Sequence, residues 1–421
     1  MISILSSPTV ITKRKYSIYV AMLMVLIWIL CGGGNVNVAI ALLVITSMFS
    51  FSTKIEIENK MIFIYLVFIL YSIIITAFFW DDNIDKSLSA HQLAKYILIL
   101  LGTFLTYRKI DFESFLVTLR NAGIFLVIFA CIEGIVGTNY LALIISGNSV
   151  SYENGQRAYS IFNHPLLAIS FYIFFLLLVL LFPFKKRVFQ YFFVSSCILA
   201  ILYNRSRSGW LALLVLCFIY GIKFRHFIMN EVIKITSRHS KNRVVFGGLV
   251  VATLLGSEVL GRGILSSFFQ VISKRFKGSF EAGIGKIVRL ETIESSIKYW
   301  ITENHIMEMI FGMGKNADRA FLQKHPVVKG NWVWNYAIDN QYITWIHESG
   351  LLGMCFMLVI LIMSIQRFFR CNSSNKCGML ANSMIIALMI SAFFYEMFNY
   401  QIMVSFFCLF LTLSEVTWLQ D

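Results

Sequence analysis

Two closely spaced arginines stand immediately before an apolar stretch in the segment Asn204-Arg205-Ser206-Arg207-Ser208-Gly209-Trp210. In an extended segment, Arg205 and Arg207 project to the same side. Ser208 is suited to be the N-cap of the helix that follows, and a helix N-terminus favours an anion. Arginine binds phosphate bidentately, and each charge-assisted bond contributes roughly 1.5–3 kcal/mol. The segment predicts a phosphate site, although these arginines could instead extend to lipid headgroups.

A second polar group follows in Asp339-Asn340-Gln341-Tyr342 and in His347-Glu348. Asp339 is well placed as a helix N-cap, and this structural role is the alternative to a catalytic role for the same residue. An ionised Glu348 two turns into an apolar helix costs several kcal/mol unless it is paired. We therefore expect an arginine from the preceding loop as its partner. Either carboxylate, Asp339 or Glu348, could serve as a general base.

Two further arginines accompany polar segments. Arg289 opens an amphipathic helix, where an arginine is ordinarily only solvated. Arg157 lies in Gln156-Arg157-Ala158-Tyr159, which leads to Asn163-His164-Pro165. No set of His, Cys and Asp residues in the sequence has metal-ligand spacing. It also contains no phosphate loop and no nucleophile elbow. The sequence therefore predicts neither a metal site nor a cofactor.

The composition places these residues in a membrane protein. The chain has 421 residues, of which 58% are hydrophobic and 14% are charged, whereas a soluble domain carries roughly a quarter charged residues. The net charge of +14 could suggest nucleic acid, but most cations lie in short connections between apolar runs, where membrane topology explains them better. We therefore expect membrane lipids, and not nucleic acid, around the chain.

Twelve apolar stretches have the length of spanning helices, for which about 20 residues are needed. They cover Tyr16–Cys31, Val36–Phe51, Met61–Trp80, His91–Tyr107, Phe115–Val136, Pro165–Phe184, Val188–Tyr203, Ser208–Phe224, Val244–Leu260, Asn340–Ser364, Met379–Glu396 and Tyr400–Trp418. The predicted fold is an all-α polytopic membrane protein. Residues 1–260 would form helices one to nine, residues 261–338 one large loop, and residues 339–421 helices ten to twelve.

The distribution of Lys and Arg predicts the orientation. Alternate connections hold about nineteen cations on one side, against about four in the short loops of the other side, so both termini are predicted to be cytoplasmic. The loop Gly261–Ile338 then faces outward. Within it, Leu265–Lys277 is suited to a helix lying at the membrane surface, and Ile287–Ile301 shows helical periodicity.

In their order along the chain, these motifs resemble the O-antigen ligase/polymerase family of bacterial envelope glycosyltransferases. The resemblance is carried by three segments of the C-terminal half: Ser206-Arg207-Ser208-Gly209-Trp210, the stretch from Arg289 to Ile310-Phe311-Gly312-Met313-Gly314, and Asp339-Asn340-Gln341-Tyr342 with Glu348-Ser349-Gly350-Leu351-Leu352-Gly353. The ligase branch typically has His where this chain has Asp339, which favours a polymerase of repeat units.

The resemblance implies a GT-C-like membrane enzyme with its large loop in the periplasm. The donor would be an undecaprenyl-pyrophosphate-linked oligosaccharide at the inner membrane, and a chain-length-regulating membrane protein is an expected partner. Arg205, Arg207 and Arg289 would bind the pyrophosphate, together with Arg157, Asn340 and Tyr342 around the glycan. Asp339 or Glu348 would act on the acceptor hydroxyl. Such a displacement would be inverting and would need no metal, since arginines supply the charge.

Two other functions fit parts of the sequence. A ligase would transfer finished glycan from undecaprenyl pyrophosphate to a lipid A core. A transporter of lipid-linked oligosaccharides would place ionisable residues near the bilayer midplane. The candidates for such midplane positions are Lys95, Arg120, Glu133 and Glu396. A loop of roughly 75 residues is unusual for a small transporter, which favours the enzyme.

Overall fold

The computed structural model describes most of the chain. The described residues are 8–32, 35–48, 60–78, 86–107, 110–136, 139–141, 157–162, 164–225, 284–303, 305–329, 332–334 and 337–418. Two predictions, the spanning helix Val244–Leu260 and the surface helix Leu265–Lys277, lie outside these residues. The loop Gly261–Ile338 is therefore seen from Ile284 onward.

Long apolar helices dominate this part of the chain. In chain order the elements are α1 (Pro8–Gly32), α2 (Val36–Met48), α3 (Lys60–Phe78), α4 (Lys86–Tyr107), α5 (Phe112–Val136), η1 (Ser160–Phe162), α7 (Pro165–Leu181), α8 (Arg187–Asn204), α9 (Arg207–Lys223), α13 (Ile284–Thr302), α14 (Ile306–Phe311), α15 (Ala317–Lys324), β1 (Val327–Lys329), β2 (Trp332–Trp334), α16 (Gln341–Arg370), α17 (Lys376–Ala392), η2 (Met397–Asn399) and α18 (Gln401–Trp418). The strands β1 and β2 pair antiparallel, with Val328 opposite Val333.

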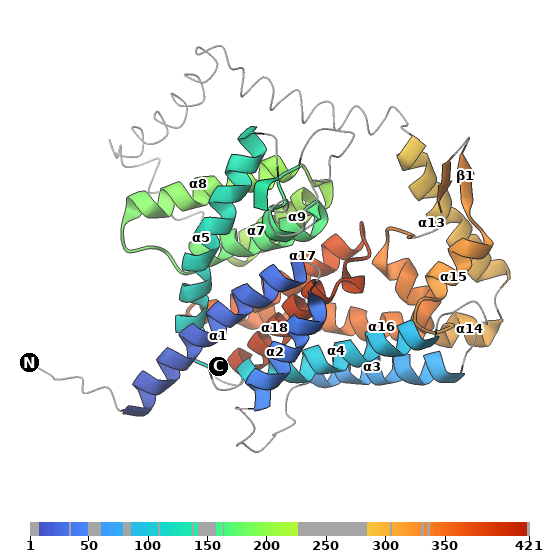
Figure 1. The fold of residues 1–421 in the computed structure, drawn as a ribbon, viewed down its shortest axis with the longest axis horizontal. Helices are drawn as coiled ribbons and strands as arrows, with labels where there is room; N and C mark the ends of the chain where they lie inside the picture. The colour runs from blue at the N-terminus through green and yellow to red at the C-terminus, as the bar shows by residue number, and fades with distance from the viewer. Residues whose placement is uncertain are drawn as a thin grey trace, which may run out of the picture.

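The helices pack around a central pair, α17 and α18 (Figure 1). Both helices are buried along most of their length, because α7 and α9 cover α17 while α3 and α4 cover α18. The helix α16 lies against α3 and α17, and α13, α14 and α15 gather on its N-terminal part. The N-terminal end of α1 and the C-terminal end of α18 lie toward the opposite side of the view from α13–α15 (Figure 1). The elements of the predicted loop thus form a cap over one end of the bundle.

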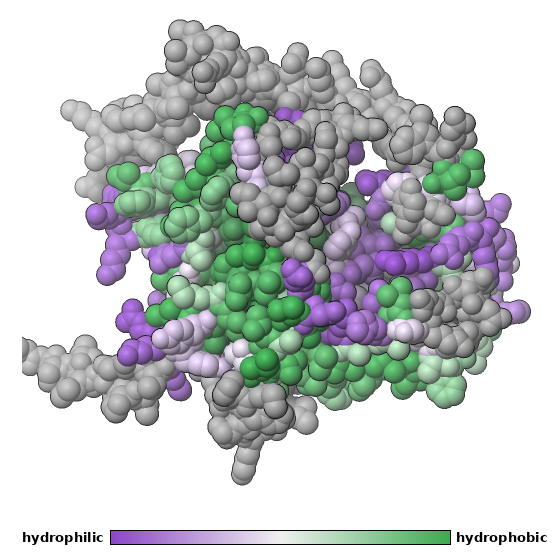
Figure 2. Space-filling view, in the orientation of Figure 1, coloured by the Kyte–Doolittle hydropathy of each residue, from purple (hydrophilic) through white to green (hydrophobic). Residues whose placement is uncertain are grey.

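The surface agrees with a chain that crosses a membrane. Six described helices are long and apolar enough to span: α3, most of α4, α5, α8, α16 and α18; α2, α7 and α17 contain shorter apolar stretches. Hydrophobic side chains cover the exposed side of α3, whereas hydrophilic side chains gather over the region of α13–α15 (Figure 2). The protein is an all-α membrane protein with a polar cap at one end of its apolar bundle.

The predicted helices among the described residues are present, with corrected ends. The structure confirms the amphipathic helix, as Ile284–Thr302. The prediction that the helix starting at Met379 reaches Glu396 is wrong, since α17 ends at Ala392 and η2 follows. Local polar groups decide these ends: Asn375 accepts the Gly378 N–H at 2.8 Å and caps the start of α17.

The helix α16 is broken in its third turn by a close contact with the cap. Gly350 has φ 62° and ψ −169°, which is not helical. The N–H groups of Met313 and Gly314 donate to the carbonyls of His347 and Glu348, both at 2.9 Å. A Cβ on Gly312, itself at φ 84°, would lie 2.5 Å from the Gly350 nitrogen. Two glycines are needed here because the two backbones touch, and the break separates a short N-terminal piece of α16 from its long apolar part.

A buried ion pair stabilises the opposite end of the bundle. Arg367 of α16 contacts Glu415 of α18 through both carboxylate oxygens, at 3.0 and 3.2 Å. The first of these oxygens also accepts the Met61 N–H at the start of α3, at 2.5 Å. One carboxylate therefore joins three helices in a buried environment.

Replacement of Glu415 by Gln is expected to lower the free energy of unfolding by about 3–5 kcal/mol, because it leaves the Arg367 charge buried without its partner. The check is chemical unfolding in detergent micelles. Arg370→Ala, which removes an exposed cation one turn further along α16, should change the free energy of unfolding by less than about 0.5 kcal/mol. Equal effects of the two substitutions would contradict the role of the pair.

Candidate active site

An arginine of α13 and an aspartate before α16 meet at the polar end of the bundle. Arg289 Nε lies 2.6 Å from Asp339 Oδ2, and the two side chains are 47% and 6% exposed. The structure thus brings together two residues that are fifty positions apart and that the sequence placed in one site. The cation is accessible to a ligand, whereas the carboxylate lies beneath it.

The relative position of α13 and α16 depends on a buried histidine. His347 of α16 is fully buried, and its Nε2 lies 3.1 Å from the Ser296 hydroxyl of α13. The ring also stacks near Phe321 and Tyr299, with centroid separations of 5.1 and 6.3 Å. His347 therefore orients α13, and with it Arg289, against the start of α16.

The backbone at Asp339 adopts the left-handed conformation, with φ 59°. The alternative role of Asp339, as the N-cap of this helix, is therefore excluded. Asn340 is the cap, and its side chain accepts the N–H groups of Tyr342 and Ile343 at 3.0 and 3.3 Å. Because Asn340 satisfies the helix end, the Asp339 carboxylate does not serve as a cap and contacts Arg289 instead.

Glu396 holds this turn in place. Its Oε1 accepts the N–H groups of Ile338 at 2.6 Å and Asp339 at 3.2 Å, and its Oε2 accepts from the Asn399 amide at 3.0 Å. Burial raises the pKa of Glu396 to about 7, and the charge of Asp339 acts in the same direction. Burial likewise raises the pKa of Asp339, against the opposing effect of Arg289.

The raised pKa of Glu396 predicts that stability decreases as the pH rises. The folded protein keeps a proton that the unfolded chain releases near the ordinary value of 4.5. The contribution to the free energy of unfolding is therefore fully present below pH 4.5 and is lost as the pH rises through about 7. Burial raises the pKa values of Asp318 and Asp339 as well, so both residues act in the same direction. The lowered pKa of His164 acts in the opposite direction between about pH 4 and 6.5, so the contribution of Glu396 is measured as the difference between its variant and the wild type.

Thermal unfolding in detergent between about pH 5 and pH 8 measures this dependence. Glu396→Gln, which is neutral throughout, should show a smaller decrease of the unfolding midpoint with pH than the wild type. Glu294→Gln, an exposed position on α13, is the control and should keep the wild-type slope. A Glu396→Gln slope equal to that of the wild type would refute the assignment.

Residues 157–162 and His164 lie near Arg289, whose charge acts on His164. Asn204 binds this segment with its amide group, which donates to the carbonyls of Ala158 and Pro165, both at 2.8 Å. Glu133 accepts the Ser160 N–H at 2.8 Å and so holds the turn η1. Burial, followed by the charges of Arg157 and Arg289, lowers the pKa of His164 to about 4. Arg157 and Arg289 thus lie within electrostatic reach of one neutral histidine.

Arg205 and Arg207 lie at the junction of α8 and α9, next to residues 157–162. The Tyr203 carbonyl accepts the Ala158 N–H at 3.3 Å. The prediction of an extended Arg205–Arg207 segment capped by Ser208 is wrong. Arg205 is a left-handed C-cap with φ 55°, the N-cap is Ser206, and Arg207 is the first helical residue. Their side chains therefore do not share one side as in a strand, and Arg207 is exposed.

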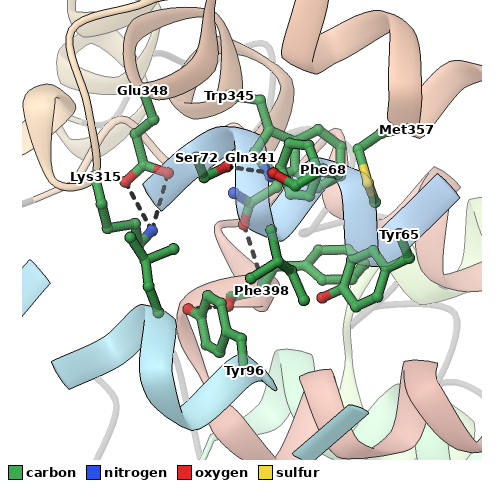
Figure 3. A pocket seen from close by; sticks show the side chains of 12 residues that line it. Tyr65, Phe68, Ser72, Tyr96, Lys315, Gln341, Trp345, Glu348, Met357 and Phe398 are labelled. Atoms are coloured by element: carbon green, nitrogen blue, oxygen red, sulfur yellow. Dashed lines mark hydrogen bonds and ion pairs between the residues drawn. The ribbon is translucent and has the colours of Figure 1, made fainter. Parts of the chain in front are cut away.

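The buried Glu348 has a lysine as its partner, so the expected pairing with an arginine is wrong. Lys315 Nζ contacts both carboxylate oxygens at 2.7 and 2.9 Å, and the Asn316 N–H donates to one of them at 2.9 Å. Burial opposes the charge of Lys315, but the ion pair raises its pKa. The pair lies at one side of a small cavity of about 20 Å³, with Tyr96, Gln341 and Trp345 in its wall (Figure 3). This volume holds about one water molecule.

Glu348 is thus occupied as an internal anchor of the cap. Lys315 Nζ also donates to Asn399 Oδ1 at 3.0 Å, and Asn399 in turn donates to Glu396. A chain of hydrogen bonds therefore links the buried Lys315–Glu348 pair to the turn of Asp339. Of the two predicted carboxylates, Asp339 is the one beside an accessible cation, whereas Glu348 stabilises the framework behind it.

The remaining predicted ligand, Tyr342, points away from the ion pair. Its hydroxyl donates to the Met389 carbonyl of α17 at 3.0 Å, so it fastens α16 to α17. Four residues outside the predicted site lie near the ion pair instead: His164, Tyr395, Glu396 and Tyr400. Of these four, only Glu396 could have been identified from the sequence, because a carboxylate in an apolar stretch points to a specific partner.

The described residues contain no group of three His, Cys, Asp or Glu side chains that could hold a metal ion. The arrangement offers a half-exposed guanidinium over a carboxylate with further arginines nearby, which suits an anion with an adjacent hydroxyl. No protein-family model matches the chain, and neither does any curated protein.

Proposed function

We propose that this protein is a membrane glycosyltransferase that polymerises undecaprenyl-pyrophosphate-linked oligosaccharide repeat units, as an O-antigen polymerase does. The ion pair of Arg289 and Asp339 carries this proposal. It supplies a cation for a leaving pyrophosphate and a carboxylate for an acceptor hydroxyl, both at the polar end of an apolar bundle. In this proposal the cap faces the periplasm from the inner membrane, and both termini are cytoplasmic.

The ion pair suggests how the reaction begins. A donor pyrophosphate would compete with Asp339 for the half-exposed Arg289, because phosphate oxygens bind guanidinium bidentately. Once Arg289 turns to the phosphate, the buried carboxylate loses its neutralising partner and becomes a stronger base. Asp339 would then be activated only when the donor is bound, which limits transfer to water.

The bonds and charges balance without a metal ion. The acceptor oxygen attacks the anomeric carbon of the donor sugar while the bond from that carbon to the pyrophosphate oxygen breaks. Asp339 takes the hydroxyl proton, and the electron pair of the broken bond stays on the pyrophosphate. Arg289, aided by Arg157 and the Arg205–Arg207 turn, stabilises the charge that develops there. Attack from the opposite face inverts the anomeric configuration.

The transporter alternative loses support from the contacts of its candidate residues. Arg120 donates to the carbonyls of Phe182 and Pro183 at 2.5 and 3.0 Å. Glu133 and Glu396 accept backbone N–H groups of η1 and of the turn before α16. Each of these three residues therefore has a structural partner, which accounts for its presence in an apolar stretch without a transport path.

Glycan profiling on gels tests the proposed function in a strain lacking the gene. A core carrying a single repeat unit, returned to a ladder by the wild-type protein and not by Arg289→Ala, would establish a polymerase that needs Arg289. A bare core with long lipid-linked glycan would indicate a ligase. An unchanged ladder in the deletion strain would exclude both enzymes.

A further inference from the structure

Three aromatic side chains form a hydrogen-bonded cluster beside the ion pair. The His164 and Tyr395 rings are stacked at a centroid distance of 4.7 Å with an angle of 5° between planes, and the Tyr400 ring lies 5.6 Å from Tyr395. Tyr395 Oη lies 3.4 Å from His164 Nε2 and also shares a hydrogen bond with Tyr400 Oη. The hydroxyls and the imidazole thus form one chain.

The direction of this chain follows from the other nitrogen of the histidine. His164 Nδ1 accepts the Leu166 N–H at 3.2 Å as the N-cap of α7. Since Nδ1 is an acceptor, the proton of the neutral ring is on Nε2, which therefore cannot accept the Tyr395 proton. Tyr395 then donates its own proton to Tyr400. The proton of Tyr400 must point away from Tyr395, because its oxygen is already the acceptor there.

The free end of the chain lies at the candidate active site. Tyr400 is 37% exposed, whereas Tyr395 is buried. Among the residues that the structure describes, the Tyr400 hydroxyl makes no hydrogen bond other than that with Tyr395. Glu396, the neighbour of Tyr395 in the chain, accepts the Asp339 N–H, which places the cluster against the turn that bears Asp339. At its other end, His164 lies in the fields of Arg157 and Arg289.

We propose that the Tyr400 hydroxyl is a preset hydrogen-bond donor to an anionic phosphate oxygen of the substrate, with Tyr395 and His164 as its positioning residues. The guanidinium groups of Arg157 and Arg289, which act on His164 at the other end of the cluster, identify the ligand as an anion. A fixed O–H donor adds to their charge without a reorganisation cost. The inference rests on the proposed function and adds to it a substrate contact that needs no charged side chain.

Binding of inorganic pyrophosphate to the purified protein in detergent, measured by titration calorimetry, tests this donor. Tyr400→Phe should weaken binding roughly ten- to a hundredfold, because it deletes one charge-assisted hydrogen bond. Tyr395→Phe and His164→Asn should weaken it about two- to fivefold, since Tyr400 keeps its proton and loses its preset direction. Asn preserves the helix cap of α7 and breaks the chain. Tyr220→Phe, whose hydroxyl bonds Ser383 at 2.9 Å at a distance from the site, is the matched control.

The outcomes separate this inference from the proposed function. Wild-type affinity in Tyr400→Phe or in His164→Asn, with binding lost in Arg289→Ala, would overturn the donor chain and leave the anion site standing. Absence of pyrophosphate binding by the wild type, or equal binding by Arg289→Ala, would overturn both. Unfolding midpoints of all variants, compared with that of Tyr220→Phe, identify any loss caused by misfolding.

Discussion

Asp339→Asn is expected to slow glycan elongation by about 10²–10⁴-fold, the range that a general base contributes. The amide keeps the shape of the carboxylate but cannot accept the proton of the acceptor hydroxyl. The fold should persist, because Asn tolerates the left-handed conformation that Asp339 adopts at φ 59°. The measurement is the elongation rate of the purified protein in vesicles with a lipid-linked repeat unit, alongside the unfolding midpoint.

Two variants control this experiment. Lys298→Ala and Glu294→Gln change exposed charges of α13, the helix that carries Arg289. Both should elongate glycan at the wild-type rate. Arg289→Ala should lose activity through weaker donor binding as well, so its KM should rise, whereas Asp339→Asn should lower kcat. Full activity of Asp339→Asn would exclude this carboxylate as the base.

Gly350→Ala is expected to lower the free energy of unfolding by more than about 4 kcal/mol. The backbone there, at φ 62° and ψ −169°, is a conformation essentially confined to glycine, and a Cβ would lie 2.3 Å from the Ile310 carbonyl oxygen. Neither side of this contact can yield, because both are main chain. The substitution should also disturb the site, since the broken piece of α16 begins next to Asp339.

Denaturant titration in micelles measures the effect, with Gly221→Ala as the matched control. Gly221 lies in α9, and a Cβ built on it meets nothing within 4 Å. Because Ala is about 1 kcal/mol more favourable than Gly inside a helix, that control should be neutral or stabilising. A small effect of Gly350→Ala, similar to the control, would mean that the break in α16 is not needed for the fold.

The helices could be predicted because their signal is local. Each apolar run is long enough to span a bilayer, and the structure places helices on the predicted runs from Tyr16–Cys31 to Tyr400–Trp418 that it describes. The ends were less accurate, since capping depends on which of several adjacent polar residues reaches a free N–H group. Ser206 took this role in place of Ser208, and Asn340 in place of Asp339.

The candidate site was predictable only in part. The resemblance grouped Arg289 with Asp339, and the structure makes them an ion pair. It also grouped Arg205 with Arg207 as one cluster, but the left-handed turn at Arg205 separates their directions. The partner of Glu348 could not be deduced, because several cations of the loop were available. Lys315 meets it because the contact between Gly312 and Gly350 brings that part of the loop against α16.

The sequence by itself determined an all-α membrane protein, a polar segment in its C-terminal half and the residue types that could bind an anion. These follow from hydrophobicity and charge, which are properties of single residues and their near neighbours. Only the tertiary structure decided which carboxylate lies beside an accessible cation, which cation that is and how Tyr400 is oriented. Each of these depends on contacts between residues tens to hundreds of positions apart, such as Glu396 with Asp339 or His164 with Tyr395, and no local pattern encodes them.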